Sequence, residues 1–420
     1  MTATASDEDR VVIVGGGVVG AFSAYYLAKA GHAVTVVDAG PFGGACSRGN
    51  CGYICPSHVL PLAGPGAIGT TLRTMMRKGS PIRIGLGTVL SHPGWFLRFA
   101  RNCNEAAMMA AAGPILALTK SSRALYDEVI AAEDLDCEWD RNGLLFVFRT
   151  RAAMDHYAEV DHLLRERFDT PARRLDGDAL AAFEPALKPG LPGGWLYEGD
   201  AQLRPDRLMA ELKRVLEGLG VSILENRKVT GFLRQAGRAA GVRTDGGEIP
   251  AGRVVVATGA WTPGLARELG CKVPIQPGKG YSVTYPRPEG SPGVPMIFEE
   301  DRVAVSPFHS GFRIGSMMEL VGPDASLDPR RLGVLTETAN RYLKPQTTGA
   351  PEDSWWGWRP MTPDGLPLIG APPATPNVLV AAGHNMLGMT MGPATGKLVA
   401  ELVGGEAPHI DPAPYAVGRF

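Results

Sequence analysis

The segment VVIVGGGVVG, residues 11–20, joins a short apolar run to a GxGxxG motif made by Gly15, Gly17 and Gly20. An apolar run of this length is typical of a central parallel strand, and residues 18–30 place apolar side chains at helical spacing. The first glycine permits a tight turn, the second lets the backbone approach a pyrophosphate, and the third lets helix and strand pack closely. The motif predicts a dinucleotide site, and a glycine turn with a purely structural role is the alternative.

A second apolar strand, residues 34–37, ends at Asp38, 18 residues after Gly20. A carboxylate at this place accepts a ribose hydroxyl and disfavours a 2′-phosphate, while the helix N-terminus faces the phosphate charge. Strand, helix, second strand and acid agree, which favours a β-α-β unit that binds a nucleotide. The contacts predicted in this unit are Gly15, Gly17, Val18, Val19, Gly20, Asp38 and Ala39.

Three distant segments favour FAD over NAD, because GxGxxG serves both cofactors. CSRGNCG at 46–52 is small and polar enough to lie against a flat ring, and VVVATGAW at 254–261 reads as a strand and turn of the first sheet. The last predicted helix begins near Gly388, where backbone N–H groups and the helix dipole would stabilise negative charge on a reduced flavin. A plain strand-helix turn is the alternative there. The further FAD contacts predicted are Ser47, Asn50, Gly52, Val229, Thr258, Gly259, Trp261, Gly388, Met389 and Thr390.

The bulk composition is typical of an ordinary soluble globular protein. The 420 residues carry 42 Lys and Arg against 43 Asp and Glu, so no overall nucleic-acid footprint is present and no nucleic-acid partner is predicted. The first ten residues are acidic and lack the apolar core of a secretory signal, and the longest charge-free apolar stretch, 106–118, is too short to span a bilayer. We therefore expect a cytoplasmic protein.

The pattern of elements predicts an α/β fold in which a Rossmann-like FAD-binding domain is interrupted by an α+β substrate domain with a mostly antiparallel sheet. The nucleotide-binding segments are predicted at 8–66, 195–270 and 355–410, and the substrate domain at 67–194 and 271–354. Gly246 and Gly247 mark a hairpin turn. A chain of this length leaves a cleft between domains for chemistry.

Six cysteines do not form a disulfide scaffold in a chain of this size. Cys46, Cys51 and Cys55 cluster in sequence, but their spacing is not that of a zinc or iron-sulfur site, so no metal is predicted. Small packing residues are the favoured interpretation, and a covalent or redox role for Cys51 or Cys55 stays open.

Together these segments resemble the D-amino-acid oxidase superfamily, and most closely its bacterial D-amino-acid dehydrogenase branch. The resemblance spans residue 11 to about residue 402 and is more specific for the superfamily than for a substrate. Its motifs are VVIVGGGVVG, CSRGNCG, the Pro-Gly stretch 61–66, VVVATGAWT, PGKGYSVT, FRIGSMMEL, GWRPMTPDGLPLIG and AGHNMLGMTMGPATGKL.

The resemblance implies that Arg359, in the GxRPxTPD segment, pairs with the substrate carboxylate, a task for which a planar guanidinium fork is suited. A surface salt bridge is the alternative. Tyr281 resembles a residue of a pocket-lining strand, although a buried tyrosine filling a sheet would read the same way. His384 adjoins the flavin turn, where it could tune the ring, touch substrate or cap the turn. Tyr53 and His58 could reach the pocket rim.

The implied reaction is oxidation of a D-amino acid, cyclic ones such as D-proline or hydroxy-D-proline included, to an imino acid by hydride transfer to flavin N5. An acyclic product would hydrolyse to a 2-oxo acid and ammonia. Some sarcosine-oxidase relatives attach flavin through a cysteine just before the TPD segment. Because Gly357 and Trp358 stand there, noncovalent FAD is expected. The alternatives are a sarcosine- or glycine-type secondary amine oxidase and a noncatalytic FAD subunit of a hetero-oligomeric dehydrogenase, which the presence of Arg359 disfavours.

The electron acceptor is not encoded in any motif. Residues 68–101 mix arginines with aromatic and aliphatic side chains. A surface of this composition could rest on the inner face of the cytoplasmic membrane, where the protein could pass electrons to a quinone. Helices packed on the substrate domain with solvated arginines are the alternative. Another carrier or oxygen could serve as the acceptor.

Overall fold

A computed structural model of the protein describes residues 9–76, 79–344 and 349–420. Within them, six strands form a mostly parallel sheet in the order β19-β20-β13-β1-β2-β9, with only β19 antiparallel to its neighbour. The bounds are β1 Arg10–Val14, β2 Ala33–Val37, β9 Ser222–Leu224, β13 Arg253–Val256, β19 Leu368–Gly370 and β20 Val378–Ala382. The predicted return of the strand near residue 253 to the first sheet is confirmed, because β13 pairs with β1 in parallel.

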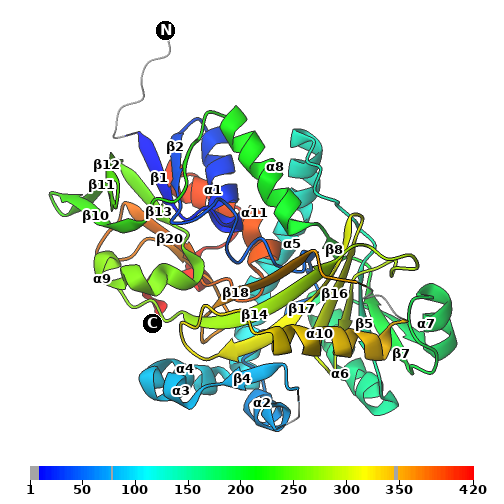
Figure 1. Cartoon of the computed structure of the whole chain (residues 1–420). Helices are drawn as coiled ribbons and strands as arrows, with labels where there is room; N and C mark the ends of the chain where they lie inside the picture. The colour runs from blue at the N-terminus through cyan, green and yellow to red at the C-terminus, as the bar shows by residue number, and fades with distance from the viewer. Residues whose placement is uncertain (1–8, 77–78, 345–348) are drawn as a thin grey trace.

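Helices and a small sheet cover the two faces of this parallel sheet (Figure 1). Val11 and Ile13 of β1 pack with the helices, whereas Val12 and Val14 pack toward the small antiparallel sheet, as the alternation of a strand requires. The helices are α1 Val18–Lys29, α5 Glu105–Glu133, α8 Pro205–Gly218 and α11 Gly388–Gly404, and the small sheet is β10 Val229–Gln235, β11 Arg238–Thr244 and β12 Gly247–Pro250.

A second, larger sheet runs beside the first in the order β18-β14-β17-β16-β15-β5-β7-β6, with β4 added beside β17. Most of its strand pairs are antiparallel, and α10 Pro329–Tyr342 covers one face. The bounds are β4 Ile82–Ile84, β5 Leu144–Phe148, β6 Arg173–Asp176, β7 Gly193–Tyr197, β14 Gln276–Tyr285, β15 Met296–Phe298, β16 Val303–Phe308, β17 Gly311–Leu320 and β18 Asp353–Met361. This is the predicted fold class, a Rossmann-like domain joined to a sheet-rich α+β domain.

The remaining elements are a short ribbon and the smaller helices. A two-stranded ribbon, β3 Tyr53–Ile54 and β8 Ala201–Gln202, joins the loop after β2 to the strand region before α8. The other helices are α2 Ala67–Met75, α3 Leu86–Ser91, α4 Pro93–Asn102, α6 Arg151–Phe168, α7 Gly177–Phe183, α9 Ala266–Leu269 and the 3-10 turns η1 Gly259–Leu265, η2 Ala413–Tyr415 and η3 Val417–Arg419.

The structure departs from the predicted segmentation at three places. The strands β7 and β18 both belong to the large sheet, although the boundaries at 195 and 355 cut through them. Helix α5, placed with the substrate segments, packs on α11 in the core of the nucleotide-binding layer. The reason is that the linking segments are structured strands and helices, so no composition change marks where one layer ends.

Candidate active site

The GxGxxG turn connects β1 to α1 with no room for side chains at its first and third glycines. A Cβ at Gly15, whose φ is 108°, would lie 2.5 Å from the carbonyl oxygen of Ala257, and one at Gly20 would lie 1.9 Å from that of Gly15. Gly17 is the N-cap residue of α1, which has no side-chain cap of its own. The turn therefore brings bare backbone and a helix N-terminus to one edge of the sheet, the arrangement that a pyrophosphate requires.

Asp38 and Ser47 both contact this turn. Asp38, at the end of β2, accepts hydrogen bonds from the backbone N–H of Gly16 at 2.6 Å and of Gly40 at 2.8 Å. Burial raises the pKa of the Asp38 carboxyl, and the two backbone hydrogen bonds oppose that shift. The Ser47 hydroxyl accepts from the N–H of Val18 at 2.9 Å, so the loop after β2 is tied to the start of α1.

The loop at 48–51 is fastened to the large sheet through every one of its carbonyl groups. Arg313 of β17 donates to the carbonyls of Arg48 (3.1 Å) and Asn50 (2.7 Å). Ser282 of β14 donates to Gly49 (2.9 Å), and Ser306 of β16 donates to Cys51 (2.6 Å). The segment predicted to line a flat ring is therefore held by the substrate-side sheet.

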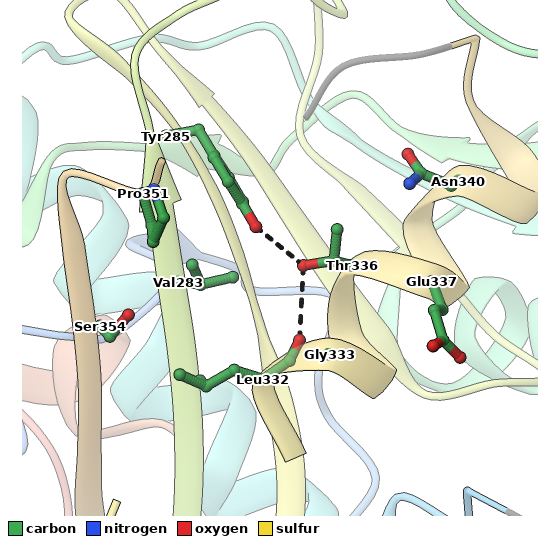
Figure 2. Close-up of a pocket in the computed structure, with 9 residues that line it drawn as sticks. All are labelled: Val283, Tyr285, Leu332, Gly333, Thr336, Glu337, Asn340, Pro351 and Ser354. Atoms are coloured by element: carbon green, nitrogen blue, oxygen red, sulfur yellow. Dashed lines mark hydrogen bonds between the residues drawn. The ribbon is translucent and has the colours of Figure 1, made fainter. Parts of the chain in front are cut away.

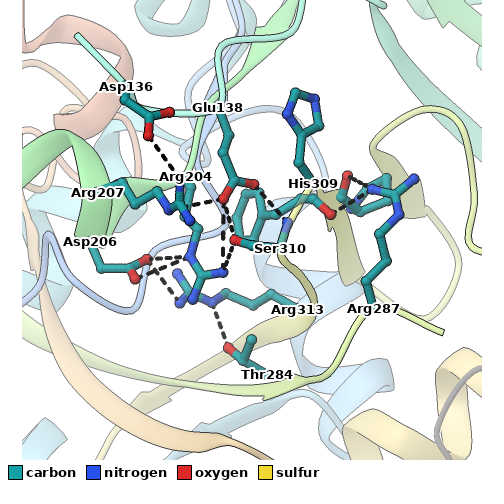
Figure 3. Close-up of polar contacts among 12 residues, drawn as sticks. Asp136, Glu138, Arg204, Asp206, Arg207, Thr284, Arg287, His309, Ser310 and Arg313 are labelled. Atoms are coloured by element: carbon teal, nitrogen blue, oxygen red, sulfur yellow. Dashed lines mark hydrogen bonds and ion pairs between the residues drawn. The ribbon is translucent and has the colours of Figure 1, made fainter.

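Arg313 was missed by the sequence reasoning. Its side chain is 2% exposed, its Nε donates to Thr284 at 2.9 Å, and Asp206 lies 3.4 Å from Nη2 (Figure 3). Burial lowers the pKa of this guanidinium. The signal that could have found it is a lone arginine within the apolar strand FRIG.

Arg359 lies on β18, the edge strand of the large sheet, and its guanidinium reaches across β14 to β17. Nη1 donates to the carbonyl of Met317 at 2.5 Å and Nη2 to that of Ser316 at 3.4 Å. A Cβ at Gly280 would lie 2.1 Å from Nη1, so the arginine occupies the space above a glycine of β14. No Asp or Glu of the described chain forms an ion pair with Arg359, and burial lowers the pKa of its guanidinium.

The neighbours of Arg359 along β18 touch both loops that flank the predicted flavin position. The carbonyl of Trp358 accepts from the Cys46 thiol at 3.0 Å, and the carbonyl of Pro360 accepts from the N–H of Asn385 at 3.1 Å. Asn385 lies in the loop before α11, and its side chain also bonds to Thr362 and Gly365. The structure thus brings together Arg359, the loop after β2 and the turn before α11.

Tyr281 does not share a face with Arg359. Because side chains alternate along a strand, Tyr281 projects from β14 on the side opposite Gly280 and packs in the core beneath α10. Its hydroxyl donates to Glu319 at 3.0 Å, and Glu319 pairs with Arg331 at 2.8 Å. The prediction that Tyr281 lines the same pocket as Arg359 is therefore not met, since strand register sets its direction.

The other predicted polar side chains are held by protein contacts. The Tyr53 hydroxyl lies within hydrogen-bond distance of the carbonyls of Met296 and Val305, at 2.7 and 2.8 Å. His58 lies beside the Phe146 ring, and burial lowers its pKa to about 4. His384 is buried against α11 with Nε2 3.0 Å from the Thr395 hydroxyl, and burial lowers its pKa to about 3. The His384 ring therefore packs against the middle of α11, and no hydrogen bond of its side chain within the described chain caps the turn.

The remaining predicted cofactor residues lie around the same edge. Asn50 accepts from the N–H of Gly52, where a Cβ would collide with Leu203. Thr390 donates to the carbonyl of Tyr53, and Trp261 lies 5.5 Å from Trp358 between ring centroids. The sites of the others are the end of β2 for Ala39, the start of β10 for Val229, the turn after β13 for Thr258 and Gly259, and the first turn of α1 or α11 for Val18, Val19, Gly388 and Met389.

Trp358 carries a donor that the described residues leave without a partner. Its Nε1 is buried and has no hydrogen bond within the described chain. A buried donor of this kind is costly unless a bound group accepts from it. The register of β18 places the Trp358 side chain on the face of Tyr281, opposite Arg359, so this donor does not belong to the Arg359 face. The features that fit a cofactor with a phosphate at one end are the side-chain-free glycine turn and the start of α11, which has no side-chain cap.

The three clustered cysteines are free thiols. Burial raises the pKa of Cys46 to about 11 and also raises that of Cys51 and Cys55, so these side chains are held as neutral thiols. Cys46 and Cys51 lie near Arg359, whose positive charge opposes the shift without overcoming burial. Their contacts are those of packing residues.

A hollow of about 310 Å³ opens on the other side of β14 (Figure 2). Val283 and Tyr285 line it together with Thr336 of α10, whose hydroxyl lies 3.0 Å from that of Tyr285. Val283 and Tyr285 share the strand face of Tyr281, opposite Gly280. This hollow is therefore separated from Arg359 by the sheet and is not part of the candidate active site.

The comparison with protein families agrees with this geometry. A family model described as DAO, FAD dependent oxidoreductase, matches residues 10–402. The chain belongs to this family. The protein is thus an FAD-dependent oxidoreductase, and the resemblance to the D-amino-acid oxidase superfamily is confirmed at that level.

Solved structures share the fold of this chain over almost its whole length. Glycine oxidase from Geobacillus kaustophilus is 24% identical with a TM-score of 0.79, covering 98% of this chain and 99% of that one. Iminodiacetate oxidase from Chelativorans sp. BNC1 is 21% identical with a TM-score of 0.75 and coverages of 97% and 99%. L-proline dehydrogenase from P. horikoshii is 22% identical with a TM-score of 0.71 and coverages of 99% and 98%. None of the helices in the described part of the chain has the length and hydropathy to cross a bilayer.

Proposed function

We propose that this flavoprotein is a dehydrogenase that oxidises the carbon-nitrogen bond of a small D-amino acid, with cyclic substrates such as D-proline or hydroxy-D-proline included. The product is the imino acid, which hydrolyses to a 2-oxo acid and ammonia when it is acyclic. The D-configuration of the substrate and the dehydrogenase activity are inferred from motifs such as PGKGYSVT and GWRPMTPDGLPLIG, which resemble those of the D-amino-acid dehydrogenase branch.

The main evidence for an amino-acid substrate is the positive charge of Arg359, which has no counter-ion in the described chain. Its hydrogen bonds go to two backbone carbonyls, and no described carboxylate neutralises it. A half-buried guanidinium without a counter-ion is costly, and a substrate carboxylate would supply two charge-assisted hydrogen bonds in a planar fork. The noncatalytic-subunit alternative would have no need of such a group.

We further propose that FAD is bound noncovalently along the edge that carries Gly15, Asp38 and Gly388. Gly15 and Gly17 would admit the pyrophosphate, and Asp38 would accept a ribose hydroxyl. When bound, the flavin supplies the hydride acceptor for the reaction. Arg359 would hold the carboxylate so that the substrate α-carbon faces the cofactor, and the large sheet together with loop 48–51 would exclude water.

The structural neighbours are consistent with this substrate class. Their names give glycine, iminodiacetate and L-proline, each of which joins a carboxylate to a carbon-nitrogen bond. The first two also favour the second candidate, a secondary amine oxidase of the sarcosine or glycine type. The two candidates share Arg359 and the flavin site, and they differ in the substrate and in the electron acceptor, a quinone or other carrier in one case and oxygen in the other.

Steady-state turnover separates the candidates. The purified holoenzyme is assayed with both enantiomers of proline and alanine, with sarcosine and with glycine, once with an artificial dye as acceptor and once by oxygen uptake. The proposal predicts that D-forms are preferred and that dye reduction exceeds oxygen uptake. Preference for L-forms would overturn the assigned configuration, and fast oxygen uptake with sarcosine or glycine would select the second candidate.

A further inference from the structure

The region of α2, α3 and α4 exposes an unusual number of large apolar side chains. Of the eleven large hydrophobic side chains that are exposed in the described chain, six come from this region: Ile68, Leu72, Met76, Leu86, Leu90 and Leu97. Met76 is 81% exposed, and Leu86 and Leu90 are 74% and 72% exposed. Such a concentration marks a contact surface, whereas scattered exposed leucines would not.

These side chains are arranged as faces of helices. Ile68 and Leu72 are four residues apart on α2, and Leu86 and Leu90 are four apart on α3, so each pair lies on one side of its helix. Figure 1 shows α2, α3, α4 and β4 gathered at one end of the molecule, beyond the edge of the large sheet. We call the exposed side chains of these three helices, with their arginines, the basic apolar face.

The charge of this face has one sign. No Asp or Glu occurs anywhere from residue 39 to residue 104, whereas Arg73, Arg83, Arg98 and Arg101 lie in or between the three helices. None of these four arginines forms an ion pair with a carboxylate of the described chain. Arg77 and Lys78, also in this part of the sequence, lie outside the described residues.

The face is firmly attached to the strand that bears Arg359. Trp95 of α4 is 8% exposed, stacks on Phe99, and donates from Nε1 to the carbonyl of Met361 at 3.1 Å. Strand β4 adds to the large sheet through Met318 and Ile82. One side of α4 therefore packs against the protein. Leu97, Arg98 and Arg101 of the same helix belong to the basic apolar face.

We propose that the basic apolar face docks on a bilayer that contains anionic lipids. Leucines and methionine inserted at the headgroup boundary, with arginines beside them and no carboxylate to repel the lipid phosphates, are the composition that such a surface binds. A second copy of the chain is a poorer occupant, because a two-fold interface would set these unpaired arginines against one another. The docking goes beyond the proposed oxidation and does not depend on its substrate.

Vesicle co-sedimentation of the full-length holoprotein tests the docking. Vesicles of phosphatidylcholine alone are compared with vesicles that also contain phosphatidylglycerol. The proposal predicts binding that requires phosphatidylglycerol and weakens as salt is added. Equal sedimentation with both vesicle types, or none with either, would overturn it.

Paired variants assign the binding to this face. Arg73→Glu with Arg101→Glu should lower vesicle affinity about tenfold or more, and Leu72→Ser with Leu90→Ser should lower it while leaving the flavin content unchanged. Arg238→Glu and Leu219→Ser, at exposed positions of β11 and after α8, are the matched controls and should bind as the parent does. If the parent self-associates in solution, and the leucine variants lose this self-association but bind vesicles as the parent does, the face binds a second copy of the chain instead.

Discussion

The guanidinium of Arg359 rests in the space that a side chain at Gly280 would fill, with Nη1 2.1 Å from the position of a Cβ there. Gly280 pairs with Gly357 across β14 and β18, and Arg359 lies opposite Gly278 on the next pair of the same face. Gly278 and Gly280 of β14 and Gly357 of β18 thus leave the space on this face that the Arg359 side chain occupies. This contact explains why the motif PGKGYSVT has glycine at this place.

Gly280→Ala should displace the guanidinium and raise KM for the amino-acid substrate, because the added methyl group occupies its present position. FAD content should stay near that of the parent. Gly333→Ala on α10 is the control, since a Cβ there meets nothing within 4 Å. Steady-state kinetics of the three proteins check the prediction, and an unchanged KM in Gly280→Ala would show that the arginine functions elsewhere.

Arg359→Lys keeps the positive charge and removes the planar fork. We expect KM to rise about 10- to 100-fold, the cost of one or two charge-assisted hydrogen bonds, while the flavin spectrum is retained. Arg330→Lys, at an exposed position of α10, serves as the control. If the kinetics of Arg359→Lys equal those of the parent, Arg359 does not bind the substrate carboxylate.

Arg313→Met should weaken FAD binding. It leaves the carbonyls of Arg48 and Asn50 without their donor, and loop 48–51 loses its central attachment to the sheet. We expect a loss of about 2–4 kcal/mol in the free energy of unfolding, together with a raised Kd for FAD.

Arg287→Met gives a matched comparison for that result. Arg287 also donates to two backbone carbonyls, those of Pro307 and Phe308, but it does not contact loop 48–51 (Figure 3). The Arg287→Met variant should have a lower free energy of unfolding than the parent, with little change in Kd for FAD. If both variants lose FAD affinity equally, general destabilisation accounts for the effect and the specific role of Arg313 fails.

Asp200 should make stability depend on pH. Its carboxyl is 1% exposed and accepts from the Ser57 hydroxyl at 2.5 Å, and burial raises its pKa from 3.8 to about 7. Between these values the folded state holds a proton that the unfolded chain has released. The contribution of Asp200 to the free energy of unfolding is therefore full below about pH 4 and is lost as the pH rises toward 7, by up to about 1.4 kcal/mol per unit.

Asp200→Asn should remove this slope, because an amide does not titrate in the range. Urea unfolding of the parent and the variant at several pH values between about 4 and 7 measures the difference. Asp136→Asn, at an exposed site, should keep the slope of the parent. A slope that persists in Asp200→Asn would assign it to other groups.

The features that the sequence reasoning predicted correctly depend on neighbours close in the chain. The GxGxxG turn, the acid at the end of β2 and the strand-helix pair of β20 and α11 follow from local spacing, and the structure has each of them. Strands β4 and β6 were missed because they span only three and four residues and carry arginines that hide the alternation.

The direction of Tyr281 and the role of Arg313 lay beyond local pattern. Which face of β14 a residue occupies depends on register with β18 and β17, and a shift of one residue reverses it. Arg313 meets Arg48 and Asn50, which precede it by more than 260 residues. A pattern confined to one strand contains no information on such a partner.

Anaerobic reduction of the bound flavin is the most direct test of the proposed function. The purified holoprotein is mixed without oxygen with D-proline, hydroxy-D-proline, D-alanine, sarcosine and glycine in turn, and the loss of flavin absorbance is followed. We expect rapid bleaching by at least one D-amino acid, and slower bleaching by the same compound in Arg359→Lys. If none of these compounds bleaches a protein that holds its full content of FAD, the proposed amino-acid oxidation is wrong.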